Sequence, residues 1–263
     1  MPRHDHDAGG DPEILEAKAS LREEVWSRLE EENAARFPGA EGRIPNFAGA
    51  DEAAERLRQI DPWNAARTVK ANPDFPQLPV RQRALEDGKI VYMAVPKLSD
   101  PNPFFLLDPD DLDESPRKAS SIKGASRNAR RIAVEDLEPV GLVVAGCVAV
   151  DRTGARLGKG GGFSDLEYAV ALEAGLVEAD TPVVTTVHPL QVVDEGRIPT
   201  SDHDVFLDWI VTPDEVIRVQ GSAKKDRSAP TGIVWEELTE EKIASIPLLQ
   251  RLRDESSAGA SES

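Results

Sequence analysis

The chain contains one glycine-rich segment, Arg156-Leu157-Gly158-Lys159-Gly160-Gly161-Gly162-Phe163-Ser164-Asp165. Residues 140–150 before it form a nearly continuous apolar run, which is typical of a central strand in a parallel sheet. Residues 165–175 after it have the apolar spacing of a helix. The order of strand, glycine loop and helix indicates an α/β fold in which the loop lies beyond the carboxyl end of a strand.

The glycine loop has the properties of an anion site. Its glycines can adopt positive φ angles without steric cost, so that backbone N–H groups turn toward an anion. The N-terminus of the next helix adds partial positive charge. The spacing fits neither GxxxxGK[ST] nor GxGxxG, so a phosphate site and a flexible turn both remain open. The candidate nucleotide-binding residues of the loop are Arg156, Gly158, Lys159, Gly160, Gly161 and Gly162.

Strand and helix patterns alternate along the rest of the chain. Strands are expected at residues 68–71, 89–95, 130–134, 140–150, 181–187, 205–211, 216–219 and 233–235. Helices are expected from residue 12 onward and at residues 51–60, 80–87, 165–175 and 239–251, and residues 101–121 are expected to form a surface excursion. The alternation predicts an α/β fold with a mostly parallel sheet covered on both faces. We expect a single domain at residues 11–253, between disordered tails at residues 1–10 and 254–263.

The composition bears on partners. The chain has 48 acidic and 31 basic residues and a formal net charge of -17. Such a surface repels nucleic acid unless the basic residues cluster. One basic cluster is long enough to consider, formed by Arg117, Lys118, Lys123, Arg127, Arg130 and Arg131. We expect it to be a solvated face, so that nucleic acid is not a predicted partner.

Other features of the composition point to the compartment. The chain has 10 lysines against 21 arginines, and dispersed acidity with little lysine is typical of cytosolic proteins from salt-loving microbes. An ordinary acidic cytosolic protein is the alternative. The one cysteine, Cys147, lies in an apolar run and is expected to be buried. No disulfide within the chain is possible, which fits a cytoplasmic location, and no segment approaches the roughly 18 apolar residues of a membrane span.

A second cluster of polar residues follows the strand expected at residues 181–187. It consists of Asp202-His203-Asp204 and Asp208. Because ligands lie beyond the carboxyl ends of strands in α/β sheets, this cluster and the glycine loop are expected at the same edge. Asp165 and Asp204 could jointly hold Mg²⁺, which favours carboxylates and substrate phosphates. Aspartates that cap a turn are the alternative. His188 and His203 are candidates either for acid–base chemistry or for structural hydrogen bonds.

The first expected helix carries two cations on one face. Lys18 and Arg22 are four residues apart, so their side chains lie one above the other. The apolar stripe of this helix includes Leu21, Val25 and Leu29, which are expected to face the core. The two cations therefore project together from the helix, either toward a ligand or into solvent.

Three motifs occur here in the same order as in 5-formyltetrahydrofolate cyclo-ligases, also called methenyltetrahydrofolate synthetases. They are Lys18-Ala19-Ser20-Leu21-Arg22, the glycine loop at residues 156–165, and Asp202-His203-Asp204-Val205 with Asp208. The chain resembles that family over residues 12–235. Within it, residues 43–47, 69–74, 158–168 and 181–185 resemble the branch of methenyltetrahydrofolate synthase domain-containing proteins. The resemblance implies a three-layer α/β/α sandwich of the NagB/RpiA/CoA-transferase type.

The resemblance also implies an activity, the ATP- and Mg²⁺-dependent conversion of 5-formyltetrahydrofolate to 5,10-methenyltetrahydrofolate with release of ADP and phosphate. It implies that Lys18 and Arg22 bind ATP phosphates and act in catalysis with Lys159. It also implies that Asp165 and Asp204 bind Mg²⁺ and that Phe163 and Ser164 contact the substrate, a reduced folate or related pterin. A monomer or a homodimer is expected.

The sequence departs from the family pattern at two places. The family loop typically reads GxGxGYYD, and Ser164 stands here in place of its second tyrosine. The segment that supplies a substrate-binding glutamate has no clear equivalent in residues 43–47. The alternative to an enzyme is therefore a non-catalytic relative that binds a nucleotide, a folate or RNA. Retention of Lys18, Arg22, Lys159, Asp165 and Asp204 favours the enzyme.

Overall fold

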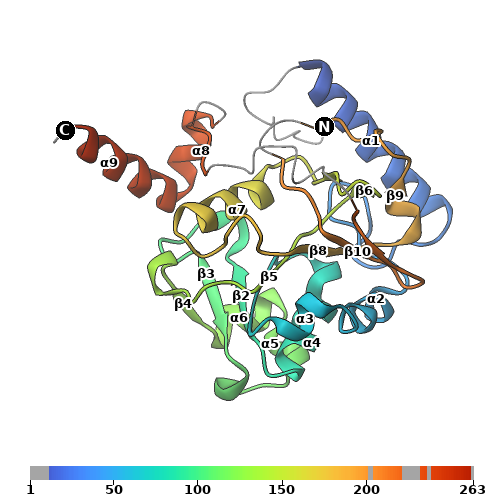
Figure 1. Ribbon diagram of the computed structural model, residues 1–263, viewed down its shortest axis with the longest axis horizontal. Helices are drawn as coiled ribbons and strands as arrows, with labels where there is room; N and C mark the ends of the chain where they lie inside the picture. Colours follow the sequence, from blue (N-terminus) through green and yellow to red (C-terminus); the bar gives the residue numbers. More distant parts are fainter. Residues whose placement is uncertain (1–11, 201–203, 221–231, 236–237, 262–263) are drawn as a thin grey trace.

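The computed structural model describes residues 12–200, 204–220, 232–235 and 238–261, and it contains one large and one small sheet (Figure 1). The large sheet has eight strands in the order β11-β10-β8-β5-β1-β2-β3-β4. The strands are β1 (Thr68–Ala71), β2 (Ile90–Ala94), β3 (Phe104–Leu107), β4 (Arg130–Ile132), β5 (Leu142–Val144), β8 (Val183–Thr186), β10 (Trp209–Val211) and β11 (Val216–Arg218). The five strands from β10 to β2 are parallel to one another. At one edge β11 pairs antiparallel with β10; at the other, β3 pairs antiparallel with β2 and β4 pairs antiparallel with β3.

Helices cover both faces of the large sheet. Successive strand residues point to opposite faces, so that Val143 of β5 packs with one helix layer and Val144 with the other. The layer on the side of Val143 consists of α7 (Phe163–Glu173), α8 (Glu240–Ser245) and α9 (Pro247–Ser261). The opposite layer includes α2 (Ala50–Leu57), α3 (Asp61–Ala65), α4 (Leu78–Glu86), α5 (Pro116–Ala119) and α6 (Ile122–Asn128). The predicted α/β sandwich with a mostly parallel sheet is confirmed.

The small sheet forms a separate layer with the first helix. It has the order β7-β6-β9, made of β6 (Ala149–Asp151), β7 (Arg156–Leu157) and β9 (Val192–Val193). The predicted apolar stripe of α1 (Pro12–Glu31) is buried against this sheet through Leu21, Val25 and Leu29. Lys18 and Arg22 lie at helical spacing on the same side of α1 as this stripe, so its packing also brings them to the glycine loop that follows β7.

Short 3-10 turns complete the fold. They are η1 (Phe75–Gln77), η2 (Pro96–Leu98), η3 (Pro109–Asp111), η4 (Val134–Asp136) and η5 (Pro189–Gln191).

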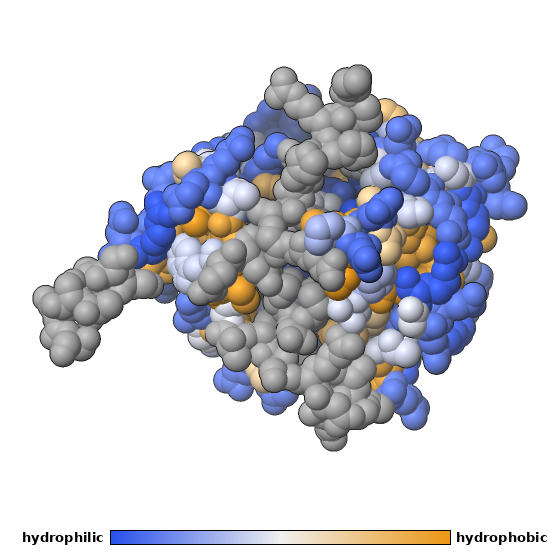
Figure 2. All heavy atoms as spheres, turned by 90° about the horizontal axis from the view of Figure 1, so that it is seen from above, coloured by the Kyte–Doolittle hydropathy of each residue, from blue (hydrophilic) through white to orange (hydrophobic). Residues whose placement is uncertain are grey.

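None of the helices in the described ranges is long and apolar enough to cross a membrane. Seen from above in Figure 2, hydrophilic residues form most of the visible rim of the molecule, as the composition predicts. Cys147 is buried as predicted, with 1% of its surface exposed.

Several predicted element boundaries are wrong. The apolar run at residues 140–150 is not one strand: β5 ends at Val144 and β6 of the other sheet begins at Ala149. Both strands are fully buried, so that no change of periodicity marks the break. Gly146 lies between them, where an added Cβ would approach Gln77 to 3.1 Å and Ile44 to 3.2 Å. The close approach of these side chains explains why glycine stands at the crossing between the two sheets.

The predicted surface excursion at residues 101–121 contains an inner strand instead. Phe104 and Phe105 of β3 are both 1% exposed and pack on opposite faces of the sheet. The prolines and aspartates on either side of this short run concealed it in the sequence.

The C-terminal elements also differ from the prediction. Residues 233–235 are not a strand, and the helix expected at residues 239–251 is divided into α8 and α9 at Ile246. Ile246 is extended, with φ -119° and ψ 102°, because the proline that follows it disfavours helical backbone at that position. Helix α9 continues to Ser261, into the stretch where we expected a disordered tail. The other expected tail, residues 1–10, lies outside the described residues.

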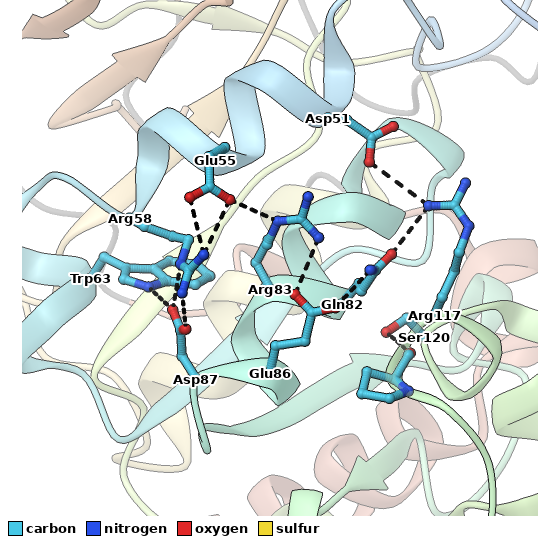
Figure 3. A network of polar contacts seen from close by, with 11 residues as sticks. Asp51, Glu55, Arg58, Trp63, Gln82, Arg83, Glu86, Asp87, Arg117 and Ser120 are labelled. Atoms are coloured by element: carbon cyan, nitrogen blue, oxygen red, sulfur yellow. Dashed lines mark hydrogen bonds and ion pairs between the residues drawn. The ribbon is translucent and has the colours of Figure 1, made fainter.

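A polar network ties the helices of one layer together (Figure 3). Asp87 accepts from Arg58 at 2.5 Å and from the indole of Trp63 at 2.9 Å. Glu55 of α2 pairs with both Arg58 and Arg83 of α4 at 3.0 Å. The two arginines link α2 with α4, and the indole of Trp63 adds α3 through Asp87. The buried Trp63 thus anchors α3 just before β1, the strand that leads directly to the site described below.

Candidate functional site

The glycine loop lies at the carboxyl edge of the parallel strands, between β7 and α7. Two contacts join it to the segment that follows β1. Lys159 Nζ lies 2.9 Å from Asp74 Oδ1, and Ser164 Oγ lies 3.4 Å from Asn72 Oδ1. The loop therefore packs beside the end of the strand β1, as expected for a ligand site in an α/β sheet.

The backbone of the loop requires glycine at two positions. Gly160 has φ 106° and Gly162, the N-cap of α7, has φ 61°. Side chains other than glycine rarely adopt such angles. A Cβ at Gly160 would also lie 3.4 Å from the guanidinium carbon of Arg22. The loop is thus a tight turn closed on one side by a cation.

Helix α1 brings both of its predicted cations to this loop. Lys18 Nζ lies 3.1 Å from Asp204 Oδ2, and Arg22 Nε donates to the carbonyl of Gly158 at 2.8 Å. The side chains of Lys18 and Asp204 are 13% and 14% exposed. The two cations of α1 thus lie at the same end of the site, Lys18 against Asp204 and Arg22 against the glycine loop.

Arg156 links the two aspartates that the sequence singled out. Its guanidinium pairs with Asp165, and its Nε donates to the carbonyl of Val205 at 3.0 Å. Burial alone would lower the pKa of Arg156, but the nearby carboxylates, Asp165 foremost and Asp204 among them, outweigh it and raise this pKa. Nη1 of the same side chain is buried without an acceptor among the described residues. Arg156 is therefore a buried cation held from two sides, by the carboxylate of Asp165 and the carbonyl of Val205.

The site pairs each of these cations with an oxygen of the protein. Lys18 pairs with Asp204, Arg156 with Asp165, and Lys159 with Asp74. No group of three or more His, Cys, Asp or Glu side chains able to hold a metal occurs in the described part of the chain. Two carboxylates, Asp165 and Asp204, suit Mg²⁺ when phosphate oxygens complete its ligands. Asp202 and His203 lie outside the described residues.

A buried ion pair beneath the loop escaped the sequence analysis. Lys70 Nζ of β1 lies 2.5 Å from Glu167 Oε2 of α7, and Asn72 Nδ2 donates to the same oxygen at 2.7 Å. Burial raises the pKa of Glu167, although Lys70 opposes this change. Asn72 Oδ1 accepts from the backbone N–H of Gly146 at 3.0 Å. The sequence did contain a signal for this pair. Lys70 and Glu167 are charged residues within a strand pattern and a helix pattern that are otherwise suited to burial.

Arg81 of α4 fixes the segment that carries Asp74. It is 1% exposed, and it donates to the backbone carbonyls of Asn72, Asp74 at 3.2 Å and Ser120 at 2.9 Å. Burial lowers the pKa of Arg81, and the nearby Asp74 opposes this change. The carbonyl of Pro73 accepts from the guanidinium as well, at 3.3 Å. Because four carbonyls converge on one planar guanidinium, the backbone after β1 is held in the orientation that places Asp74 against the loop.

His188 occupies a structural position. Its Nδ1 accepts from the backbone N–H of Leu190 at 3.2 Å at the start of η5, and its ring meets Phe47 edge-on with centroids 6.2 Å apart. Burial lowers the pKa of His188 below 6.5; Asp214 opposes this change and Arg36 adds to it. The hydrogen bond to Nδ1 requires an imidazole that is unprotonated at that nitrogen.

We expect protonation of His188 to destabilise the protein in mild acid. Since the folded pKa is the lower one, the contribution is present above about pH 6.5 and is lost as the pH falls through the folded pKa. His188→Asn keeps a cap acceptor that does not titrate. The melting temperature of this variant, measured from pH 5 to pH 8, should therefore fall less in acid than that of the wild type. Parallel curves for the two proteins would contradict this assignment.

Comparisons with known proteins agree with these motifs. Residues 14–213 match the model of the 5-formyltetrahydrofolate cyclo-ligase family. The chain is 39% identical over 241 residues to a methenyltetrahydrofolate synthase domain-containing protein of Mus musculus, covering 90% of this chain and 63% of that relative. It is 35% identical over 240 residues to the protein of that name in Homo sapiens, covering 90% of this chain and 61% of the relative. The chain thus spans less than two thirds of these relatives.

A solved structure is also similar. It is a 5,10-methenyltetrahydrofolate synthetase of Aquifex aeolicus, 18% identical, with a TM-score of 0.49, covering 78% of this chain and 93% of that one. The family model and the sequence identities lead to the assignment. The chain belongs to the 5-formyltetrahydrofolate cyclo-ligase family.

Proposed function

We propose that this protein closes the ring of 5-formyltetrahydrofolate to give 5,10-methenyltetrahydrofolate, with ATP converted to ADP and phosphate. One observation carries the proposal. Cations from α1, β7 and the glycine loop converge with two carboxylates at the carboxyl edge of the sheet. Such a set suits phosphoryl transfer, in which the protein chiefly positions the reactants and neutralises charge.

The proposed role of the cations is to bind the phosphates of ATP. Lys18 and Arg22 approach from α1, Lys159 from the loop, and Arg156 from beneath it with its remaining buried N–H. The N–H groups of Gly158, Gly160, Gly161 and Gly162 are proposed to add backbone contacts at the N-terminus of α7. Each cation would exchange its present oxygen partner for a phosphate oxygen. The cations themselves would therefore need to move little when ATP binds.

Asp165 and Asp204 are proposed to hold Mg²⁺ together with phosphate oxygens. The ion would neutralise charge on the phosphates. When Arg156 and Lys18 bind phosphate, they would release Asp165 and Asp204, which would then bind Mg²⁺. This exchange of partners predicts that ATP and Mg²⁺ bind more tightly together than either does alone.

The reaction forms one bond at phosphorus and one at carbon. The formyl oxygen attacks the γ-phosphorus of ATP and ADP leaves. The substrate N10 then attacks the activated formyl carbon and loses its proton, and phosphate departs with the former formyl oxygen. Phe163 at the start of α7 is proposed to stack on the pterin, and the hydroxyl of Ser164 is proposed to contact the substrate where the family has tyrosine.

The experiment follows formation of the methenyl product by its absorbance, with ATP and Mg²⁺, in low and in high salt. We expect Asp165→Asn to reduce the rate at least about 100-fold, because one of the two carboxylates proposed to hold the charge-neutralising Mg²⁺ is lost. Asp180→Asn, an exposed aspartate just beyond α7, is the matched control and should retain the wild-type rate. A folded wild type that binds ATP or folate without forming product would favour the non-catalytic relative.

A further inference from the structure

Lys242 lies on α8, beyond residues 14–213 that match the family model. It nevertheless reaches the glycine loop. Its Nζ donates to the carbonyl of Gly161 at 2.8 Å and lies 5.2 Å from the centre of the ring of Phe163. One ammonium thus contacts both the last peptide of the loop and the aromatic side chain that begins α7.

The position of Lys242 is fixed by packing. Ile243 is 3% exposed, and Ile246 and Leu249 are fully buried in the same core as the apolar face of α7. The hydroxyl of Thr239 caps α8 by accepting from the backbone N–H of Lys242 at 3.1 Å. The backbone of Lys242 is therefore attached to the same layer as the loop that its side chain contacts.

The contact to Gly161 orients a peptide group of the loop. In a planar trans peptide, the carbonyl of Gly161 and the N–H of Gly162 point in opposite directions. Because Lys242 holds the carbonyl, the N–H of Gly162 is directed away from α8. At the same time the attraction between the ammonium and the ring restricts the orientation of Phe163.

We propose that Lys242 is a positioning residue of the site: it fixes the Gly161–Gly162 peptide and the Phe163 ring for a ligand that carries phosphates and a flat ring. This inference rests on the proposed function, since it concerns the same site. If so, ligand affinity also depends on α8, which lies outside the residues that match the family model.

The test compares three variants. Lys242→Met keeps the length of the side chain but removes its charge and its donor, whereas Lys242→Arg keeps both. Glu241→Gln removes a charge from the neighbouring exposed position of α8 and is the control. We expect Lys242→Met to raise the KM for ATP and for folate about tenfold, equivalent to about 1.4 kcal/mol, with a small effect on kcat. Lys242→Arg should restore most of the loss.

A second readout requires no activity. Amide hydrogen exchange in a peptide that covers residues 158–166 should be faster in Lys242→Met than in Lys242→Arg, Glu241→Gln or the wild type. If the wild type forms no product, the proposed function fails, while this comparison still decides the role of Lys242. Unchanged exchange in Lys242→Met, or a loss that Lys242→Arg does not restore, would overturn the inference.

Discussion

Lys70→Met is expected to lower the free energy of unfolding by about 3–5 kcal/mol, the effect of breaking a buried ion pair by removing one partner. Lys70 and Glu167 have side chains that are only 3% and 5% exposed. Methionine fills the space of the lysine but leaves the carboxylate of Glu167 with Asn72 alone. Denaturant unfolding followed by circular dichroism measures the change. A loss below about 1 kcal/mol would mean that the pair is solvated in the folded protein.

The double variant Lys70→Met/Glu167→Leu is the control for this result. When both charges are replaced by apolar groups, no uncompensated charge remains, and buried pairs replaced in this way often lose little stability. We therefore expect the double variant to be more stable than Lys70→Met. It should nevertheless bind the folate less tightly than the wild type, because Glu167 also orients Asn72 beside Ser164, which is proposed to contact the substrate.

The pH dependence of Lys70→Met follows from Glu167. Burial raises the pKa of this carboxyl above 4.5, and removal of Lys70 takes away the group that opposes the rise. An acid with a raised folded pKa loses stability as the pH rises above its unfolded pKa, because the unfolded state releases the proton first. The difference in stability between Lys70→Met and the wild type should accordingly be smaller near pH 5 than near pH 8.

The sequence predicted the parts of the site that local rules determine. The helical period places Lys18 and Arg22 on the same side of α1 as Leu21 and Val25, so that burial of the two apolar residues brings the cations to the loop. Likewise, the positive φ angles of Gly160 and Gly162 are what a run of glycines permits. In each case a few neighbouring residues contain the whole signal.

The parts that the sequence did not predict depend on contacts between distant residues. Lys70 and Glu167 are 97 positions apart, and Lys159 and Asp74 are 85 positions apart. Which of 48 acidic residues meets a given cation is decided by the order of strands in the sheet. For the same reason the helical spacing of α8 does not reveal that Lys242 reaches Gly161.

Arg22→Met is expected to lower kcat/KM for ATP by about 100- to 1000-fold, the range found when one preorganised donor to a reacting oxyanion is removed. Arg22 lies against the two groups that a phosphate would meet. Its Nε donates to the carbonyl of Gly158 at 2.8 Å, and its guanidinium carbon lies 3.4 Å from where a Cβ on Gly160 would be. Methionine preserves the aliphatic part of the side chain, so the unfolding temperature should change little.

Two further variants separate the charge of Arg22 from its shape. Arg22→Lys keeps the charge but not the planar set of donors, and a lysine cannot contact Gly158 and a phosphate in the same bidentate way. We therefore expect its kcat/KM to lie between those of the wild type and Arg22→Met. Glu23→Gln, on the neighbouring exposed position of α1, should retain the wild-type value. Equal kcat/KM values for Arg22→Met and the wild type would show that Arg22 does not act on ATP.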